Sequence, residues 1–425
     1  MRIAFISYEY PPDTAFGGIA TYVHHAARML RRGGHDVDVF CGSLSREGSA
    51  REDGIQVHRV RMSAPDQMRF FGAQVAPRFR ECHGAGGGYD VLESPELNAE
   101  ACESLALAPA LPLVLKLHTP TYLIARHTVP PLKLRQRLRF ALGALRRGRA
   151  PWLPPNRELP ARDAFEKAFA HCADEIAAPS RAIGETVGRD WGLPPERVAI
   201  LPLPYEPPPS LLALPPGGES ARVLFLGRLE PRKGVQHLAA AIPEILRRVP
   251  GARFRFVGQV LHSPNHGQAM DDYIRAQVGD RGQETLEFCG AAKPEEINAH
   301  LGASAVCVFP SMWESFGYVC LEAMAAGRAI VGSSSGGMSE ILGPGPSGLL
   351  VPPGNPRDIA QAVIALLTQP QLRRTLGEAA RQRVRTNYGY DAILPQQLDG
   401  YARAIARRKP AGARPAGAIP RRPAL

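Results

Sequence analysis

Two strand–loop–helix stretches decide the fold: residues 223–234, VLFLGRLEPRKG, and residues 309–324, FPSMWESFGYVCLEAM. In each, a short apolar run typical of a buried strand ends at a polar loop, and a helical pattern follows. Strands that alternate with helices pair in parallel through right-handed crossovers. Ligands bind such sheets at the carboxyl ends of the strands, so we expect the loops after Leu226 and Phe309 to line a site.

The same alternation runs through the whole chain in two blocks, separated by a proline-rich stretch. Residues 201–220 contain seven prolines and two glycines, a composition typical of a linker. The chain has 425 residues, more than one hydrophobic core usually serves. We therefore predict two Rossmann-like, doubly wound α/β domains that face each other across a cleft. The strands are expected at 2–7, 35–40, 91–92, 113–117 and 175–178 in the first block, and at 223–226, 254–257, 286–288, 306–309 and 329–331 in the second.

The domain limits follow from this pattern. The first domain is predicted to span residues 1–205 and the second residues 206–387. The last 17 residues, 409–425, contain four prolines and no acidic residue, and we expect a disordered basic tail there.

The composition indicates the charge of the partner and the redox state of the compartment. The net charge of +11 predicts an anionic partner, such as a nucleoside diphosphate, a phosphorylated acceptor or an anionic membrane surface. No zinc-finger spacing or RNA-binding aromatic motif accompanies the charge, so nucleic acid is not expected. The seven cysteines include no Cys-x-x-Cys pair, which favours a reducing cytoplasm. No apolar run is long enough to span a membrane, but peripheral contact at its inner face remains open.

The two loops carry the charged residues that indicate a site. Arg228 and Lys233 follow the first strand, and Glu314 and Glu322 follow the second one. Two fixed cations beside a helix N-terminus suit a diphosphate. If Glu314 lies on the loop and Glu322 two turns further along the helix, the two carboxylates suit a sugar hydroxyl and a ribose diol of one extended ligand. Gly317, at the start of that helix, lets such a ligand approach the backbone closely.

This combination of cations and carboxylates strongly resembles that of the retaining glycosyltransferases of family 4, which have the two-domain GT-B fold. The resemblance extends over nearly the whole chain. Residues 332–354 resemble the family's next loop and strand, and residues 378–407 resemble its closing helices. The last of these, at about 388–408, is expected to cross back to the first domain.

The resemblance implies a role for each residue of the second domain. Arg228 and Lys233 would neutralise the leaving diphosphate and take part in catalysis. Glu322 would hold the ribose hydroxyls, and Glu314 would contact the donor sugar and take part in catalysis. Backbone amides would follow the sugar and phosphate at Phe316, Gly317 and Tyr318.

In the first domain, the resemblance implies two further donor contacts and one catalytic residue. Gly17 and Gly18 resemble the family's glycine-rich loop near the diphosphate. His118 resembles the family's histidine close to the reacting carbon. Whether it acts as a base or only positions the sugar stays open, because the leaving phosphate can itself take the acceptor's proton.

These roles require no metal and no cofactor beyond a UDP- or GDP-linked sugar as co-substrate. Asp36 and Asp38 match an Asp-x-Asp metal motif, but they lie within the expected strand HDVDVF, where alternate residues share one face. We therefore interpret them as strand residues. The predicted activity is a metal-independent, retaining transfer of a hexose-type sugar.

The acceptor is not identified by the sequence and could be a sugar, a lipid-linked compound or a small molecule. Residues 132–147 form a basic amphipathic pattern without an acid. A solvated helix face and a surface for an anionic membrane both fit this pattern. Three other functions remain as alternatives: an isomerase similar to the nucleotide-sugar 2-epimerases, a nucleotide-sugar-binding protein without activity and, more remotely, a sugar phosphorylase.

Overall fold

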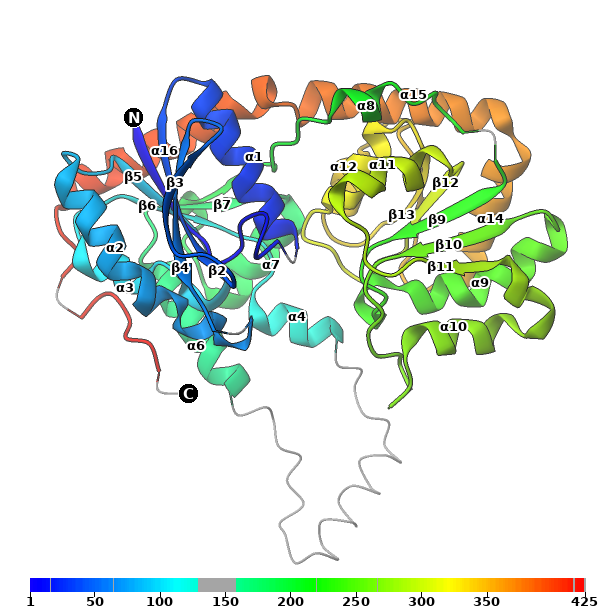
Figure 1. Ribbon diagram of the computed structural model, residues 1–425, viewed down its shortest axis with the longest axis horizontal. Helices are drawn as coiled ribbons and strands as arrows, with labels where there is room; N and C mark the ends of the chain where they lie inside the picture. Colours follow the sequence, from blue (N-terminus) through cyan, green and yellow to red (C-terminus); the bar gives the residue numbers. More distant parts are fainter. Residues whose placement is uncertain are drawn as a thin grey trace, which may run out of the picture.

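The chain forms two sheets, mostly of parallel strands, one in each half of the molecule (Figure 1). The computed structural model describes residues 1–15, 17–63, 65–128, 158–218, 220–265, 267–415 and 417–423. The predicted arrangement of two Rossmann-like domains is confirmed.

The first sheet has eight strands in the order β3-β4-β2-β1-β5-β6-β7-β8. All neighbours pair in parallel except β3 and β4, an antiparallel edge pair that the sequence pattern did not predict. The residues of β1 are almost all buried because helices cover both faces of the sheet, which explains their continuous apolar run. The strands are β1 (Arg2–Ile6), β2 (Asp36–Ser43), β3 (Gly48–Glu52), β4 (Ile55–Arg61), β5 (Val91–Pro95), β6 (Leu113–Lys116), β7 (Glu175–Ala178) and β8 (Val198–Ile200). The helices are α1 (Gly18–Arg32), η1 (Pro65–Phe70), α2 (Phe71–Ala85), η2 (Leu97–Ala99), α3 (Cys102–Leu107), α4 (Thr121–Thr128), α6 (Glu158–His171), α7 (Arg181–Trp191) and η3 (Pro195–Arg197).

The second sheet has six strands in the order β11-β10-β9-β12-β13-β14, and all neighbours pair in parallel. The strand order reverses at β9 and β12, the two strands that precede the loops with Arg228 and Glu314. The strands are β9 (Arg222–Leu226), β10 (Arg253–Val257), β11 (Leu286–Phe288), β12 (Val306–Phe309), β13 (Ala329–Ser333) and β14 (Leu349–Val351). The helices are α8 (Pro209–Leu212), η4 (Pro231–Lys233), α9 (Val235–Arg248), α10 (Met270–Val278), η5 (Asp280–Thr285), α11 (Pro294–Gly302), α12 (Tyr318–Ala325), α13 (Met338–Leu342), α14 (Pro356–Thr368) and α15 (Pro370–Asn387).

The last helix, α16 (Tyr390–Ala411), crosses back to the first domain as expected (Figure 1). The side chains of Gln397 and Tyr401 donate hydrogen bonds to the buried carboxylate of Glu93 on β5. Two residues after Tyr401, Arg403 pairs with Glu175 on β7 at 2.6 Å. These contacts hold the end of the chain against the first sheet.

The prediction of a disordered tail after residue 408 is wrong for the residues that the structure describes. Arg414 is buried and pairs with Asp174 at 2.6 Å. Further along, Arg422 pairs with Glu103 at 2.6 Å and donates to the carbonyl oxygen of Asn98. Composition suggested disorder because the tail lacks acids, but its arginines bind acids and carbonyls of the first domain.

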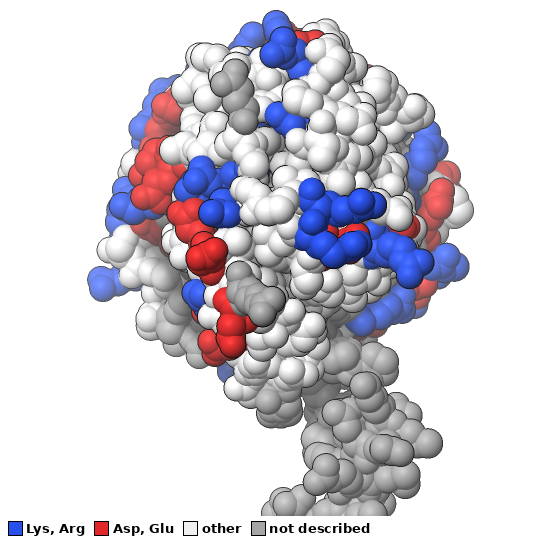
Figure 2. Space-filling view, turned by 90° about the vertical axis from the view of Figure 1, so that its right-hand side faces the viewer, with Lys and Arg blue, Asp and Glu red and all other residues white. Residues whose placement is uncertain are grey.

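On the outer face of the second domain, at the right of Figure 1, Lys and Arg side chains form separate groups, with Asp and Glu beside some of them (Figure 2). One ion pair of the second domain joins Arg255 and Glu287 at 2.8 Å. Among the described residues, no helix combines the length and the apolar character that a bilayer crossing needs. The basic segment 132–147 lies outside the described residues.

Candidate functional site

The two domains meet where the loop between β12 and α12 contacts the strand ends of the first domain. Thr119, after β6, donates its hydroxyl to Ser315 Oγ at 3.1 Å. Ser180, at the start of α7, donates to the Ser315 carbonyl oxygen at 2.7 Å. Tyr318 donates its hydroxyl to the carbonyl oxygen of Pro204 at 3.1 Å. The loop that carries Glu314 is therefore held from both domains.

Lys233 and Glu314 form a direct pair in this loop region. Lys233 Nζ lies 2.6 Å from Glu314 Oε2, and Ser311 donates to the same oxygen at 3.3 Å. Burial opposes ionisation of Glu314, but Lys233 and Arg232 nearby hold the pKa of this carboxyl below its usual range. The prediction placed Glu314 at the donor sugar, whereas here its carboxylate binds Lys233.

A glycine allows the two loops to pack this closely. Gly234, directly after Lys233, has φ of 69°, and a Cβ there would lie 1.9 Å from the carbonyl oxygen of Pro310. Any other residue would force the two loops apart and would be strained in the left-handed region. The spacing between Lys233 and Glu314 thus depends on Gly234.

Arg228 differs from Lys233 in its surroundings. Its side chain is 48% exposed, and its guanidinium lies 3.2 Å from Glu230 Oε1. Glu230 is also bound by Arg232, at 2.8 Å, and Arg232 Nη1 lies 4.0 Å from Glu314 Oε1. Arg232 and Glu230 are thus members of the same charge cluster. The sequence analysis did not predict these two residues, because it considered only the cations on either side of them, Arg228 and Lys233.

The helix that follows Glu314 begins as predicted. Gly317 caps α12 with φ of 130°, a conformation that favours glycine. Glu322 lies one turn into α12, which begins at Tyr318, and not two turns as expected. Burial raises the pKa of Glu322 to about 7. Within the described part of the chain, no group donates a hydrogen bond to its carboxylate or pairs with it.

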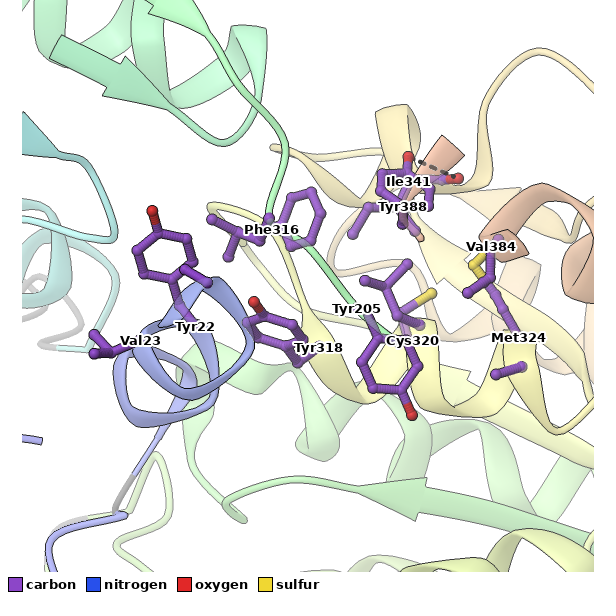
Figure 3. Packing of buried hydrophobic residues seen from close by; sticks show 14 of the residues in the cluster. Tyr22, Val23, Tyr205, Phe316, Tyr318, Cys320, Met324, Ile341, Val384 and Tyr388 are labelled. Atoms are coloured by element: carbon purple, nitrogen blue, oxygen red, sulfur yellow. Dashed lines mark hydrogen bonds between the residues drawn. The ribbon is translucent and has the colours of Figure 1, made fainter. Parts of the chain in front are cut away.

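The first domain presents the start of α1 to the start of α12. Gly17 is the N-cap of α1 and provides no side-chain cap. A Cβ on Gly18 would lie 3.8 Å from the ring of Tyr318. Figure 3 shows Tyr318 between α1, which carries Tyr22, and Tyr205. The predicted glycine pair and the predicted amides of the second domain are therefore brought together across the interface.

A carboxylate that the sequence analysis did not single out lies at the start of α1. Ala20 donates its backbone N–H to Glu9 Oε2 at 3.4 Å. Burial raises the pKa of Glu9 to about 7, against the lowering effects of the α1 amides and of Arg228 across the interface. Only tertiary structure reveals this, because Glu9 lies in the loop after β1 and has no motif of its own.

His118 follows β6 and is buried, with its ring 5.3 Å from that of Tyr22. Its backbone N–H donates to both oxygens of Glu96, at 3.0 and 2.9 Å. Burial, and then the charge of Lys116, lower the pKa of His118 to about 3, so the imidazole is neutral near pH 7. Nε2 is buried and has no hydrogen-bond partner among the described residues. Nε2 therefore keeps an unused hydrogen-bonding capacity.

Two buried carboxylates support the loop that carries His118. Glu166 on α6 accepts hydrogen bonds from the backbone N–H and the hydroxyl of Thr121, at 2.9 and 2.5 Å. Burial and the nearby Glu166 raise the pKa of Glu96 to about 8. Glu96 and Glu166 thus hold the loop that carries His118 in position, and the sequence analysis predicted neither residue.

Asp36 and Asp38 lie in β2, as the strand interpretation predicted. Asp38 lies 3.3 Å from Arg2 and accepts a hydrogen bond from Tyr89. Both aspartates are near the amino end of the strand, at the edge of the sheet opposite the site. Across the described ranges, no cluster of three or more His, Cys, Asp or Glu side chains could hold a metal ion.

Two doubly wound domains that bring cations, helix N-termini and buried carboxylates together at their interface define the GT-B class of glycosyltransferases. Residues 17–204 match the family described as "Glycosyl transferase 4-like domain", and residues 213–383 match "Glycosyl transferases group 1". The chain therefore belongs to the group 1, family 4 glycosyltransferases, and it is a glycosyltransferase.

Individual relatives agree with the family. The chain is 26% identical to a glycogen synthase of Mycobacterium tuberculosis, over 94% of each chain. A sucrose-phosphate synthase from Thermosynechococcus elongatus shares the fold, with a TM-score of 0.69 and 21% identity over 95% of this chain and 99% of that one. An Anabaena protein solved in complex with UDP and glucose also shares the fold, with a TM-score of 0.62 and 19% identity over 95% and 99% of the two chains.

Proposed function

We propose that this enzyme transfers a hexose-type sugar from a nucleoside diphosphate sugar to an acceptor, with retention of configuration and without a metal ion. The observation that carries the proposal is the meeting of α1 and α12 at Gly18 and Tyr318, beside the cation Arg228. Two helix N-termini and a nearby guanidinium suit a diphosphate. The Anabaena neighbour, solved with UDP and glucose, supports a nucleotide-sugar donor.

The unpartnered carboxylate of Glu322 suits the ribose. The side chain is half-buried, and no protein group in the described structure donates to it, so a ligand can supply the missing donors. Ribose hydroxyls are such donors, and their hydrogen bonds favour the ionised form of Glu322. Glu314 keeps Lys233 in place for the diphosphate, and its second oxygen, Oε1, lies on the side of Arg232 at 4.0 Å. We assign the contact with the donor sugar to this part of Glu314.

The chemistry requires stabilisation of a leaving diphosphate. Negative charge grows on the phosphate as the glycosidic bond breaks, so fixed cations stabilise the transition state more than the bound donor. Arg228 and Lys233 supply this charge. His118 is neutral near pH 7, so it cannot act there as a cationic acid; its unpartnered Nε2 positions the sugar through a hydroxyl group. The leaving phosphate then accepts the acceptor's proton.

The acceptor and the surroundings of the enzyme remain predictions. Glycogen synthase and sucrose-phosphate synthase, by their names, make different products, so family membership does not identify the acceptor. All seven cysteines are free, which supports a reducing compartment such as the cytoplasm. Contact of residues 132–147 with an anionic membrane is a separate proposal, tested by pelleting the protein with anionic vesicles at low salt.

The test of the proposed function is direct. Purified enzyme is titrated with UDP-, GDP- and ADP-linked hexoses, and binding is measured by calorimetry. We expect one nucleotide to bind in the presence of excess chelator. Failure of all of them to bind would contradict the proposal, and binding that requires added manganese or magnesium would contradict metal independence.

Product analysis distinguishes the remaining alternatives. We expect a transferred sugar with the anomeric configuration of the donor, and an inverted product would contradict retention. An epimerised nucleotide sugar formed without acceptor would indicate the isomerase, which the family matches disfavour. Donor binding without transfer or hydrolysis would indicate an inactive binding protein.

A further inference from the structure

Glu9 occupies the start of α1 although it belongs to the preceding loop. Its Oε2 accepts the N–H of Ala20 at 3.4 Å, and a Cβ on Gly17 would lie 3.7 Å from the same oxygen. Gly17 has no side chain to cap the helix, so the Glu9 carboxylate takes that place. The start of a helix of 15 residues favours a negative charge.

Three kinds of charged or polar group face Glu9. The amides of Gly17 and Ala20 come from α1, and Arg228 comes from the second domain. The third is Glu100, a buried acid next to α3, and the two carboxyl groups repel each other when both are ionised. Burial dominates this balance, so the pKa of Glu9 rises to about 7 and both protonation states are populated at neutral pH.

The proposed function places the donor diphosphate at the same amides and beside Arg228, and the following inference rests on it. We propose that Glu9 occupies the diphosphate position as a carboxylate in the free enzyme, and that it stays beside the bound donor as the protonated acid, donating its O–H to a phosphate oxygen. Two anions at one helix start would repel each other, whereas a carboxylic acid is a hydrogen-bond donor. Glu9 is thus a specificity-determining residue for the diphosphate.

The proton balance follows from this arrangement. At alkaline pH the proton enters the Glu9 carboxylate from solvent when the donor binds, and it returns to solvent when the nucleotide leaves. Because one proton is linked to binding, donor affinity is expected to fall by up to about tenfold per pH unit above pH 7. Glu322 acts in the opposite direction, since its carboxylate must be ionised to accept the ribose hydroxyls. The two effects are separated by comparing variants.

The experiment uses Glu9→Gln, which has the shape of the protonated acid and cannot titrate. Glu378→Gln, an exposed acid on α15 in the second domain, is the matched control. Binding of the nucleotide sugar identified above is measured by calorimetry from pH 6 to 8, in buffers of different ionisation enthalpy. The phosphates of a nucleotide sugar have no second ionisation in this range, so proton uptake reports the protein.

We expect wild type and Glu378→Gln to take up close to one more proton at pH 8 than Glu9→Gln does. The affinity of Glu9→Gln relative to wild type should rise by up to about tenfold from pH 7 to pH 8. Equal pH profiles for wild type and Glu9→Gln would overturn the inference, as would a loss of affinity in Glu9→Gln that is the same at every pH. If the variant does not fold, wild-type proton uptake at pH 8 decides: uptake supports the inference, and none overturns it.

The outcomes remain distinct from those of the proposed function. A wild-type enzyme that binds no nucleotide sugar at any pH would overturn the proposed function and this inference together. A wild-type enzyme that binds its donor without proton uptake would overturn the role of Glu9 alone.

Discussion

Glu314 and Glu322 come from the same strand–loop–helix unit, yet their environments are opposite. Glu314 is buried with Lys233 at 2.6 Å and Arg232 at 4.0 Å, and its pKa lies below the usual range. Glu322 is largely enclosed but has no partner in the described structure, and its pKa rises to about 7. The comparison teaches that the partner, and not burial alone, decides the charge of a carboxylate in this site.

The two carboxylates therefore have different tasks. Glu314 belongs to a cluster of paired charges and holds the cation of Lys233 in position. Glu322 has no hydrogen-bond donor in the described structure, so a ligand can supply one. Substitutions should separate the two groups by their effects on stability and on binding.

The largest effect is expected for Lys233→Met, which leaves Glu314 as an insufficiently compensated buried charge. Breaking a buried pair in this way costs about 3–5 kcal/mol of the free energy of unfolding. Urea unfolding measures it. The double variant Lys233→Met/Glu314→Gln should recover most of the stability but not the activity. An unchanged free energy of unfolding in the single variant would show that Arg232 alone neutralises Glu314.

Arg228→Ala should impair catalysis while the fold remains stable. Arg228 is half exposed, and its partner Glu230 keeps Arg232 at 2.8 Å, so the loss of stability should stay below about 1 kcal/mol. Loss of a cation at the leaving phosphate should lower kcat by about 10²–10³-fold, with a smaller effect on donor affinity. Steady-state kinetics and donor titration measure both, and a near-normal kcat would remove Arg228 from the diphosphate site.

Glu322→Gln should weaken nucleotide binding without loss of stability. Replacing a hydrogen bond to a charged group is expected to cost about 1–3 kcal/mol of binding free energy for donor and nucleoside diphosphate alike. Glu314→Gln serves as the comparison, because it should affect the donor more than the nucleoside diphosphate. Calorimetry with both ligands tests this, and equal nucleotide affinity in wild type and Glu322→Gln would refute the ribose contact.

The smallest effect concerns the pH dependence of stability. The raised pKa of Glu322 means that the folded state binds its proton more tightly, so its contribution falls as pH rises from about 4.5 to about 7. The lowered pKa of Glu314 means that its contribution is present above its ordinary pKa and is lost on acidification. Relative to wild type, the free energy of unfolding of Glu322→Gln should therefore be higher at pH 8 than at pH 5. No change in this difference between the two pH values would contradict the assignment of Glu322.

The sequence analysis predicted the positions of the charged residues best in the second domain, while their part in donor binding stays a prediction. The loops after β9 and β12 carry charges directly behind strongly apolar strands, so position and residue type were enough to predict that Arg228, Lys233 and Glu314 lie close together, as they do in the structure. The first domain was predicted less completely. Glu9, Glu96 and Glu166 lie in different segments: Glu9 contacts the start of α1, whereas Glu96 and Glu166 hold the loop that carries His118.

Local patterns also misled in two places. The tail after residue 408 reads as disordered because it has no acid, but Arg414 binds Asp174 of the first domain. The antiparallel pair of β3 and β4 was missed because its outer strand is exposed and lacks the apolar run of a buried strand. Both depend on partners far away in the chain, which composition and periodicity do not report.

By itself, the sequence determined the alternation of strands and helices, the break between two domains, and the loops that carry the site. These follow from apolar periodicity and from the polar residues at strand ends, which are local properties. Tertiary structure alone decided that Glu314 is paired and Glu322 is not, that His118 is neutral, and that Glu9 lies at the start of α1. The reason is that the charge and proton affinity of a group depend on burial and on neighbours within a few ångströms, which the fold brings together from distant parts of the chain.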